Sequence, residues 1–71
     1  MWRKGKERRI MREILKNARQ KAGMTQQEVA EYLGISVRMY QRIENGDSLG
    51  KIIHWDKLED LFSIPQRSLR K

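Results

Sequence analysis

Cysteine is absent from this chain, and proline and phenylalanine occur only once each. The lack of cysteine excludes disulfides, thiolate metal sites and cysteine nucleophiles, and it fits a reducing cytosol. No apolar run approaches the roughly 20 residues that span a bilayer. The N-terminus is basic, but no uninterrupted apolar segment follows it, as a signal peptide would require. We therefore expect a cytoplasmic protein without a membrane segment.

Recognisable catalytic arrangements are also missing. The sequence contains no pairing of a nucleophile with a base, no glycine-rich phosphate loop and no metal-ligand spacing. His54 is the only histidine, and a single surface histidine is the simplest interpretation of it. We therefore expect no enzyme activity, no cofactor and no bound metal.

Positive charge is abundant and unevenly placed, with a net charge of +7. Residues 1–21 hold nine Lys and Arg against two Glu, whereas residues 22–71 hold seven basic and seven acidic side chains. A basic end beside a near-neutral body indicates an anionic partner, with nucleic acid first and an anionic membrane second. The alternative is a solvated tail that binds nothing.

The length of 71 residues suits one small domain. Residues 1–8 are expected to form a flexible basic N-terminal arm, which either reaches along DNA or stays a mobile tail. Residues 9–71 are expected to form the folded domain. The sequence pattern predicts five short helices and no strand, which makes an all-α fold. The expected helices span residues 9–22, residues 25–33 with a cap at Thr25, residues 36–44 with a cap at Ser36, residues 53–62 and residues 65–69.

Capping residues and apolar spacing define these helices. Thr25 with Glu28 predicts a capping box at the second helix, and Gly34 supplies the positive φ needed for the turn after it. The first helix carries an apolar stripe at helical spacing, with basic residues mostly off that stripe. The stripe contains Ile10, Ile14, Leu15, Ala18 and Ala22, and the basic residues are Arg8, Arg12, Lys16 and Lys21.

Residues 25–45 form the most informative stretch. They predict two short helices joined by a tight turn, with the small Ala30 where the helices touch and Gly34 where the chain reverses. This arrangement is typical of a helix-turn-helix that inserts its second helix into the DNA major groove. The residues expected to face inward are Val29, Leu33, Ile35, Tyr40 and Ile43.

Residues 18–46 resemble the Xre family, the lambda-repressor-like domain of phage repressors, Cro proteins and small bacterial regulators. The resemblance extends over about residues 10–69 and implies a five-helix DNA-binding domain with a central helix-turn-helix. Two features depart from the family pattern: Tyr40 stands where an aliphatic residue is common, and the loop before the fourth helix lacks the usual proline. The matching residues are Arg19, Gly23, Thr25, Gln26, Ala30, Gly34, Ile35, Ile43, Glu44, Asn45 and Gly46.

The outer face of the helix that follows Ser36 is the expected base-reading surface. Arg pairs with the guanine edge, Gln pairs with the adenine edge, and Val contacts the thymine methyl group. The alternative is an ordinary solvated helix face. The family resemblance places base readout on the positions of Val37, Arg38, Gln41 and Arg42.

Phosphate contacts are expected at the start of the second helix, where free N–H groups and the helix dipole favour an anion. The resemblance places a DNA-backbone contact at Gln26, and it pairs Arg19 with Glu44 in a structural salt bridge that fixes the recognition helix. A surface glutamine and a turn-forming asparagine are the alternatives for Gln26 and Asn45. The expected phosphate contacts are Gln26, Gln27, Ser36, Asn45 and Lys51.

Together these features predict a sequence-specific DNA-binding transcriptional regulator of the phage or mobile-element repressor type. It would bind double-stranded DNA as a homodimer, on an inverted repeat with half-sites roughly 34 Å apart. The dimer contact is expected near Ile64, Pro65 and Leu69. The alternative is a protein-interaction module of the same fold, an antitoxin or antirepressor, and a regulatory protein partner fits either case. A basic helix lying on a membrane does not account for the well-capped remainder.

Overall fold

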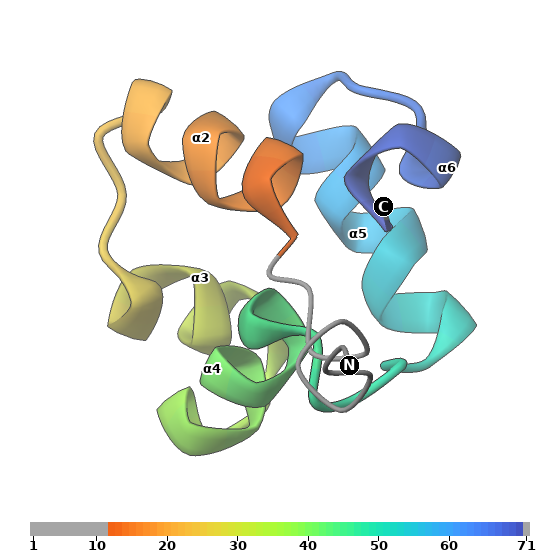
Figure 1. Ribbon diagram of the computed structural model, residues 1–71. Helices are drawn as coiled ribbons and strands as arrows, with labels where there is room; N and C mark the ends of the chain where they lie inside the picture. Colours follow the sequence, from red (N-terminus) through yellow and green to blue (C-terminus); the bar gives the residue numbers. More distant parts are fainter. Residues whose placement is uncertain (1–11, 71) are drawn as a thin grey trace, which may run out of the picture.

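The computed structural model describes residues 12–70, so the expected arm lies outside the described residues. Within this range the first helix is shorter than the expected residues 9–22, because it begins after Arg12 and ends before Ala22. The described part contains five α-helices and no strand (Figure 1), which confirms the all-α prediction. None of these helices is both long enough and apolar enough to cross a membrane. The helices are α2 (Glu13–Lys21), α3 (Gln26–Leu33), α4 (Val37–Asn45), α5 (Ile52–Phe62) and α6 (Gln66–Leu69).

Helix α3 begins and ends where its local signals predict. The Thr25 hydroxyl accepts from the Glu28 N–H at 3.1 Å, and the Glu28 carboxylate accepts from the Thr25 N–H at 2.9 Å. This reciprocal capping box satisfies two donors at the helix start. Gly34 closes the helix with φ +77°, a conformation open to glycine because it has no Cβ. The length of α3 is therefore fixed at both ends.

Helices α4 and α5 each differ by one residue from the expected bounds. Ser36 caps α4 by accepting from the Met39 N–H at 3.1 Å, as predicted, but the helix continues to Asn45 and ends at Gly46 with φ +85°. Helix α5 begins at Ile52 rather than one residue later. Such differences arise at helix ends, where the cap geometry decides which residue is last.

The core lies where α3 and α4 meet α2, α5 and α6 (Figure 1). Ala30 is fully buried, and its carbonyl accepts from the Ile35 N–H at 3.0 Å in the turn between α3 and α4. This burial agrees with the expectation of a small residue where the two helices touch. The buried apolar residues are Leu15, Ala18, Val29, Ala30, Leu33, Tyr40, Ile43, Trp55, Leu58 and Leu69.

The buried stripe of α2 is narrower than predicted. Leu15 and Ala18 are buried, whereas Ile14 is 38 % exposed and Ala22 is also exposed. Of the predicted apolar stripe, only Leu15 and Ala18 are therefore buried among the described residues, and Ile10 lies outside the described residues. A short helix of nine residues buries only the part of its apolar face that other helices cover.

Two residues near the ends of the described chain are buried against expectation. Leu69 was expected to be available for a dimer contact, but it is fully buried, because α6 packs against both α2 and α5. Arg12 was expected to lie off the apolar stripe, but only 7 % of it is exposed. The C-terminal turn contributes to both, because α6 packs against α2 and the Arg70 carbonyl accepts from Arg12.

Candidate functional site

Helix α4 has one buried face and one free face. Tyr40 and Ile43 are 0 % and 1 % exposed and anchor the inner side. Arg38, Gln41 and Arg42 lie on the outer side and are exposed. The spacing of three and four residues places the outer side chains on one face of the helix. This face therefore presents two cations and one amide in a fixed register.

Val37 differs from the other three residues expected to read bases. It is the first residue of α4, it is half-buried, and it packs against the hydrophobic core. Only part of its side chain is therefore available to a ligand that approaches α4 from outside.

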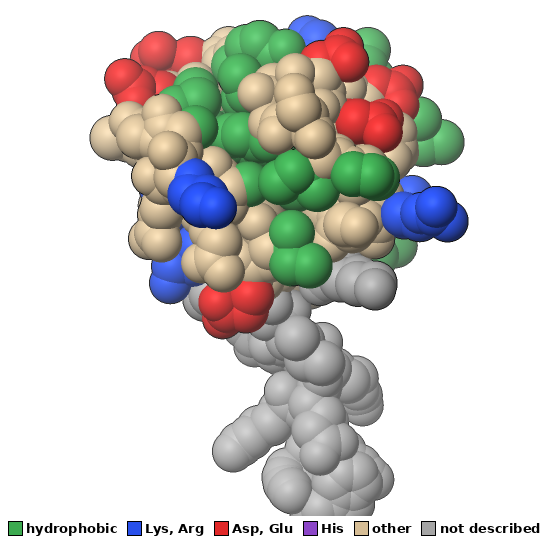
Figure 2. All heavy atoms as spheres, turned by 90° about the horizontal axis from the view of Figure 1, so that it is seen from above, with side chains coloured by type: hydrophobic (Ala, Val, Ile, Leu, Met, Phe, Trp, Pro, Cys, Tyr) green, Lys and Arg blue, Asp and Glu red, His purple; other side chains and the backbone are tan. Residues whose placement is uncertain are grey.

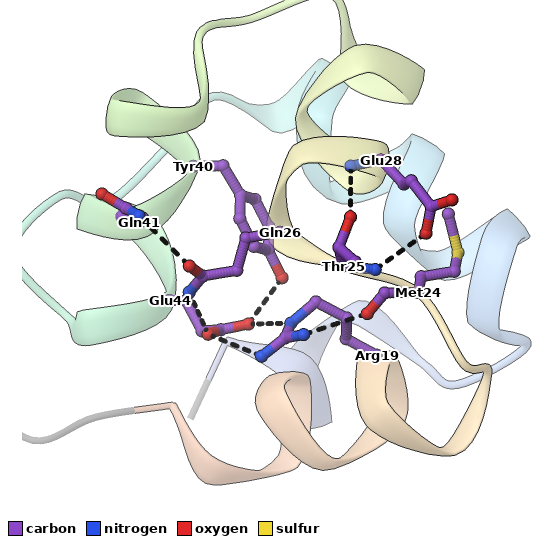
Figure 3. Close-up of polar contacts among 8 residues, drawn as sticks. All are labelled: Arg19, Met24, Thr25, Gln26, Glu28, Tyr40, Gln41 and Glu44. Atoms are coloured by element: carbon purple, nitrogen blue, oxygen red, sulfur yellow. Dashed lines mark hydrogen bonds and ion pairs between the residues drawn. The ribbon is translucent and has the colours of Figure 1, made fainter.

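A buried carboxylate lies behind the free face (Figure 3). Glu44 is 2 % exposed, and its Oε2 accepts from Arg19 Nε at 2.8 Å and from the Tyr40 hydroxyl at 2.9 Å. Its Oε1 accepts from Gln26 Nε2 at 2.8 Å and from a second Arg19 nitrogen at 3.4 Å. The structure thus contains the ion pair that the family resemblance implied. It ties α2, α3 and α4 together at one carboxylate.

Tyr40, where the family pattern has an aliphatic residue, is accounted for by the same cluster. Tyr40 and Glu44 are four residues apart in α4, so they lie on one face. An aliphatic side chain would fill the core equally well, but it would leave the carboxylate with one donor fewer. The hydroxyl supplies that donor.

The charge states of this cluster follow from its contacts. Burial alone would raise the pKa of Glu44, but hydrogen bonds from Arg19, Gln26 and Tyr40 and the charge of Arg19 bring it below its usual value. The hydrogen bond to Glu44 raises the pKa of Arg19. Burial, followed by the nearby carboxylate, raises the pKa of Tyr40. Near neutral pH the cluster therefore contains a carboxylate, a guanidinium and a neutral phenol.

The cluster continues to the surface through two glutamines. Gln26 Oε1 accepts from Gln41 Nε2 at 3.2 Å (Figure 3). A carboxylate only accepts hydrogen bonds, so Gln26 must turn its NH₂ toward Glu44 and its oxygen toward Gln41. Gln41 must then donate one N–H inward, which leaves its Oε1 and its other N–H for a ligand. The buried charge of Glu44 thus determines which hydrogen-bonding groups the exposed Gln41 side chain can offer to a ligand.

The remaining residues expected to contact phosphate lie around α3 and α4. Gln27 is exposed, and its Nε2 donates to Glu31 Oε2 at 3.1 Å within α3. Ser36 serves as the cap of α4. Asn45, the last residue of α4, and Lys51, directly before α5, are both exposed. The structure joins only Gln26 to the buried cluster.

Sequence reasoning missed two features of this region. It assigned Gln26 and Gln41 separate roles, although they are hydrogen-bonded to each other. It also missed Arg12, whose guanidinium donates to backbone carbonyls at the end of α4 and in the loop that follows. One available signal was the position of Glu44 four residues after the inward-facing Tyr40, because that spacing places the carboxylate on the inner face, where it requires several donors.

Comparison with known proteins identifies a family. A helix-turn-helix family model of the Cro/C1 type matches residues 15–65, a range that contains α3, α4 and α5 in full. Neither a curated protein nor a solved structure matches the chain significantly. Within residues 12–70, histidine and acidic side chains form no cluster of three or more that could hold a metal ion.

Proposed function

We propose that this chain, which belongs to the helix-turn-helix family of the Cro/C1 type, is a sequence-specific transcriptional regulator. The family is one of DNA-binding regulators. Sequence specificity and a repressor role of the phage or mobile-element type are our proposal. One observation carries it: α4 is fixed from behind by buried Glu44, while its outer face is free.

Base readout is assigned to the outer face of α4. Arg38 and Arg42 each offer a planar set of donors that suits the two acceptors of guanine. Gln41 keeps an acceptor and a donor after its bond to Gln26, the pair that adenine requires. Val37 contributes a smaller contact through the exposed part of its side chain.

Phosphate binding is assigned to the residues that border this face. The first N–H groups of α3 lack partners within the helix, and they lie at its positive end, which suits an anion. These contacts set the position and orientation of α4 on the duplex without reading sequence. The proposed residues are Gln26, Gln27, Ser36, Asn45 and Lys51.

We further propose that the protein binds an inverted repeat as a homodimer, through residues other than those first expected. With Leu69 buried, the prominent exposed apolar side chains near the end of α4 are Leu49, Ile52 and Ile53, which are 83 %, 73 % and 58 % exposed. Leu49 lies between two hollows of about 440 and 330 Å³, and it borders both. In a two-fold symmetric dimer, the projecting Leu49 of each copy could enter a hollow of the other copy, so the same surface serves both partners.

The size of this surface predicts when the dimer forms. Three side chains bury much less than the roughly 800 Å² per partner found in stable complexes. We therefore expect a monomer in solution and pairing only on DNA, where the first bound copy raises the effective concentration of the second.

Selection of duplexes from a random pool at fixed salt tests the proposal. We expect an inverted-repeat consensus, and the complete repeat should bind more tightly than two independent half-sites would. Leu49→Ser should lose this cooperativity and keep the half-site affinity. A wild-type protein that selects no consensus would refute sequence-specific binding, whereas equal cooperativity in Leu49→Ser would refute only the dimer surface.

A second candidate function, binding of a regulatory protein, is favoured by the face away from α4. A hollow of about 260 Å³ lies between α2 and α5, and hydrophobic side chains gather across the middle of this face (Figure 2). An antitoxin or antirepressor would use such a face. The absence of a duplex consensus in the selection would favour this function. The lining residues are Ala18, Lys21, Ala22, Leu61, Phe62 and Ile64.

A further inference from the structure

Arg12 is a buried cation whose described partners are carbonyl groups. It is 7 % exposed, and its guanidinium donates to the backbone oxygens of Ile43, Ser48 and Arg70, the last two at 2.9 and 3.0 Å. The same guanidinium lies 5.2 Å from the ring centroid of Trp55. Two regions far apart in sequence thus meet at one side chain: the end of α4 with the loop that follows it, and the end of α6.

The contacts at α4 involve its last turn. The final carbonyls of a helix have no partners within the helix, and they carry its partial negative charge. The Arg12 guanidinium donates to the Ile43 carbonyl, and the Arg12 backbone N–H donates to the Glu44 carbonyl at 2.9 Å. A cation at this end is also favourable for the helix dipole. Arg12 thus supplies a positive charge and two of the hydrogen bonds at this end of α4.

The geometry requires arginine and no other cation. Its planar fork directs several donors in fixed directions and stacks on an aromatic face, whereas a lysine offers one rotating point charge. Burial, and then the charge of Arg70, lowers the pKa of Arg12. An arginine nevertheless stays protonated at neutral pH. The guanidinium therefore keeps its full set of N–H donors at neutral pH.

Arg12 and Arg19 hold α4 in different ways. Arg19 holds the Glu44 carboxylate, a side chain on the inner face. Arg12 holds the backbone of the last turn and the Ser48 carbonyl, which lies before Lys51. Loss of Arg12 would therefore affect the end of α4 and its loop more than the start of α4, where Arg38 lies.

We propose that Arg12 is a positioning residue for DNA binding, which sets the end of α4 and the path of the loop that carries Lys51. This inference rests on the proposed DNA-binding function. Arg12 itself touches no DNA, because its guanidinium is turned toward carbonyls inside the domain. Its effect reaches the duplex through Asn45 and Lys51.

A double-mutant cycle tests this role on the selected operator, at a temperature where circular dichroism shows each variant to be folded. We expect Arg12→Lys to weaken binding by about tenfold. Lys51→Ala should weaken the wild type several-fold, and it should have little effect in the Arg12→Lys background. Arg38→Ala should have the same effect in both backgrounds. Leu58→Val, a core change on α5, controls for lost stability and should leave the affinity unchanged.

Amide hydrogen exchange gives a readout that requires no DNA. The N–H groups of residues 46–48 donate to the carbonyls of Arg42 and Ile43, near the end of α4. These three amides should exchange faster in Arg12→Lys than in the wild type. The amides of α3 should change only by the amount that the change in global stability accounts for. If Arg12→Lys does not fold, Arg12→Gln, which keeps two donors, takes its place in both measurements.

The outcomes separate the two proposals. Wild-type protein without duplex preference refutes the proposed function, and the exchange measurement still tests whether Arg12 positions the end of α4. Unchanged affinity in a folded Arg12→Lys variant, additive effects of Arg12→Lys and Lys51→Ala, or unchanged exchange at residues 46–48 would overturn the positioning role alone.

Discussion

The side-chain amide of Gln26 donates to Oε1 of Glu44 at 2.8 Å, so a buried carboxylate determines that the amide oxygen of Gln26 faces Gln41. The oxygen of the same amide accepts from Gln41 at 3.2 Å. The residue proposed to bind phosphate, Gln26, is therefore hydrogen-bonded to the residue proposed to read a base, Gln41.

The first prediction concerns this coupling. A glutamine that contacted only phosphate would, when replaced, weaken all DNA sequences alike. Because Gln26 holds Gln41, we expect Gln26→Ala also to relax the preference at the base pair read by Gln41. The measurement is duplex selection with each variant. Gln27→Ala is the matched control, since Gln27 bonds to Glu31 within its own helix and should leave the preference intact.

Arg42 is predicted to read a base. Arg42→Ala should lose about 1–3 kcal/mol on the preferred operator and much less on random duplex. Arg67→Ala removes the same charge from an exposed position on α6 and should show no such difference. Titration of both variants against operator and random DNA checks this. Equal losses on the two duplexes would remove the base-reading role of Arg42.

The stability of the domain should depend on pH through Glu44. Its pKa is lower in the folded state than in the unfolded chain, so its stabilising contribution is complete above the unfolded pKa of about 4.3 and is lost as the pH falls through the folded value. We expect Glu44→Gln to be less stable by roughly 1–3 kcal/mol at pH 7 and to depend less on pH between 3 and 5. Urea unfolding across this range measures it. Exposed Glu31→Gln is the control, and parallel pH curves for wild type and Glu44→Gln would contradict the assignment.

The helix crossing at Ala30 should not tolerate a larger side chain. Ala30 is 0 % exposed, and a leucine there would force α3 and α4 apart. We expect a loss of about 1–3 kcal/mol or more for Ala30→Leu. The neighbouring Glu31 is exposed, so Glu31→Leu should change the stability by less than about 0.5 kcal/mol. Thermal unfolding distinguishes the two, and an unaltered melting temperature for Ala30→Leu would disprove the crossing.

Alanine substitution at two glycines should distinguish the cost of backbone strain from the cost of a steric contact. Gly50 and Gly23 have φ values of +72° and +70°, but a Cβ on Gly50 would lie 3.0 Å from the Trp55 indole nitrogen, whereas one on Gly23 meets nothing within 4 Å. Both alanine variants should be destabilised by about 1 kcal/mol from φ alone. Gly50→Ala should lose more, because the indole also donates to the Leu49 carbonyl at 2.8 Å. Equal losses in denaturant unfolding would show that the indole moves freely.

Much of the fold was predictable because its signals act over a few residues. The capping box of Thr25 and Glu28 and the glycine at position 34 fix the ends of α3 within one turn of chain. The same kind of signal predicted the free face of α4, since residues three and four apart share a side. The ion pair between Arg19 and Glu44 came from the family resemblance, because nothing in the spacing of two distant residues shows that they meet.

What the sequence by itself determined was the all-α class, the order of the helices and the polar outer face of α4. The tertiary structure alone decided that Arg12 and Leu69 are buried, that Ile14 is exposed, and that Gln26 bonds to Gln41. The physical reason is one of range. Capping and helical periodicity depend on neighbours within one or two turns, whereas burial at the ends of a short helix depends on which distant segment packs over it.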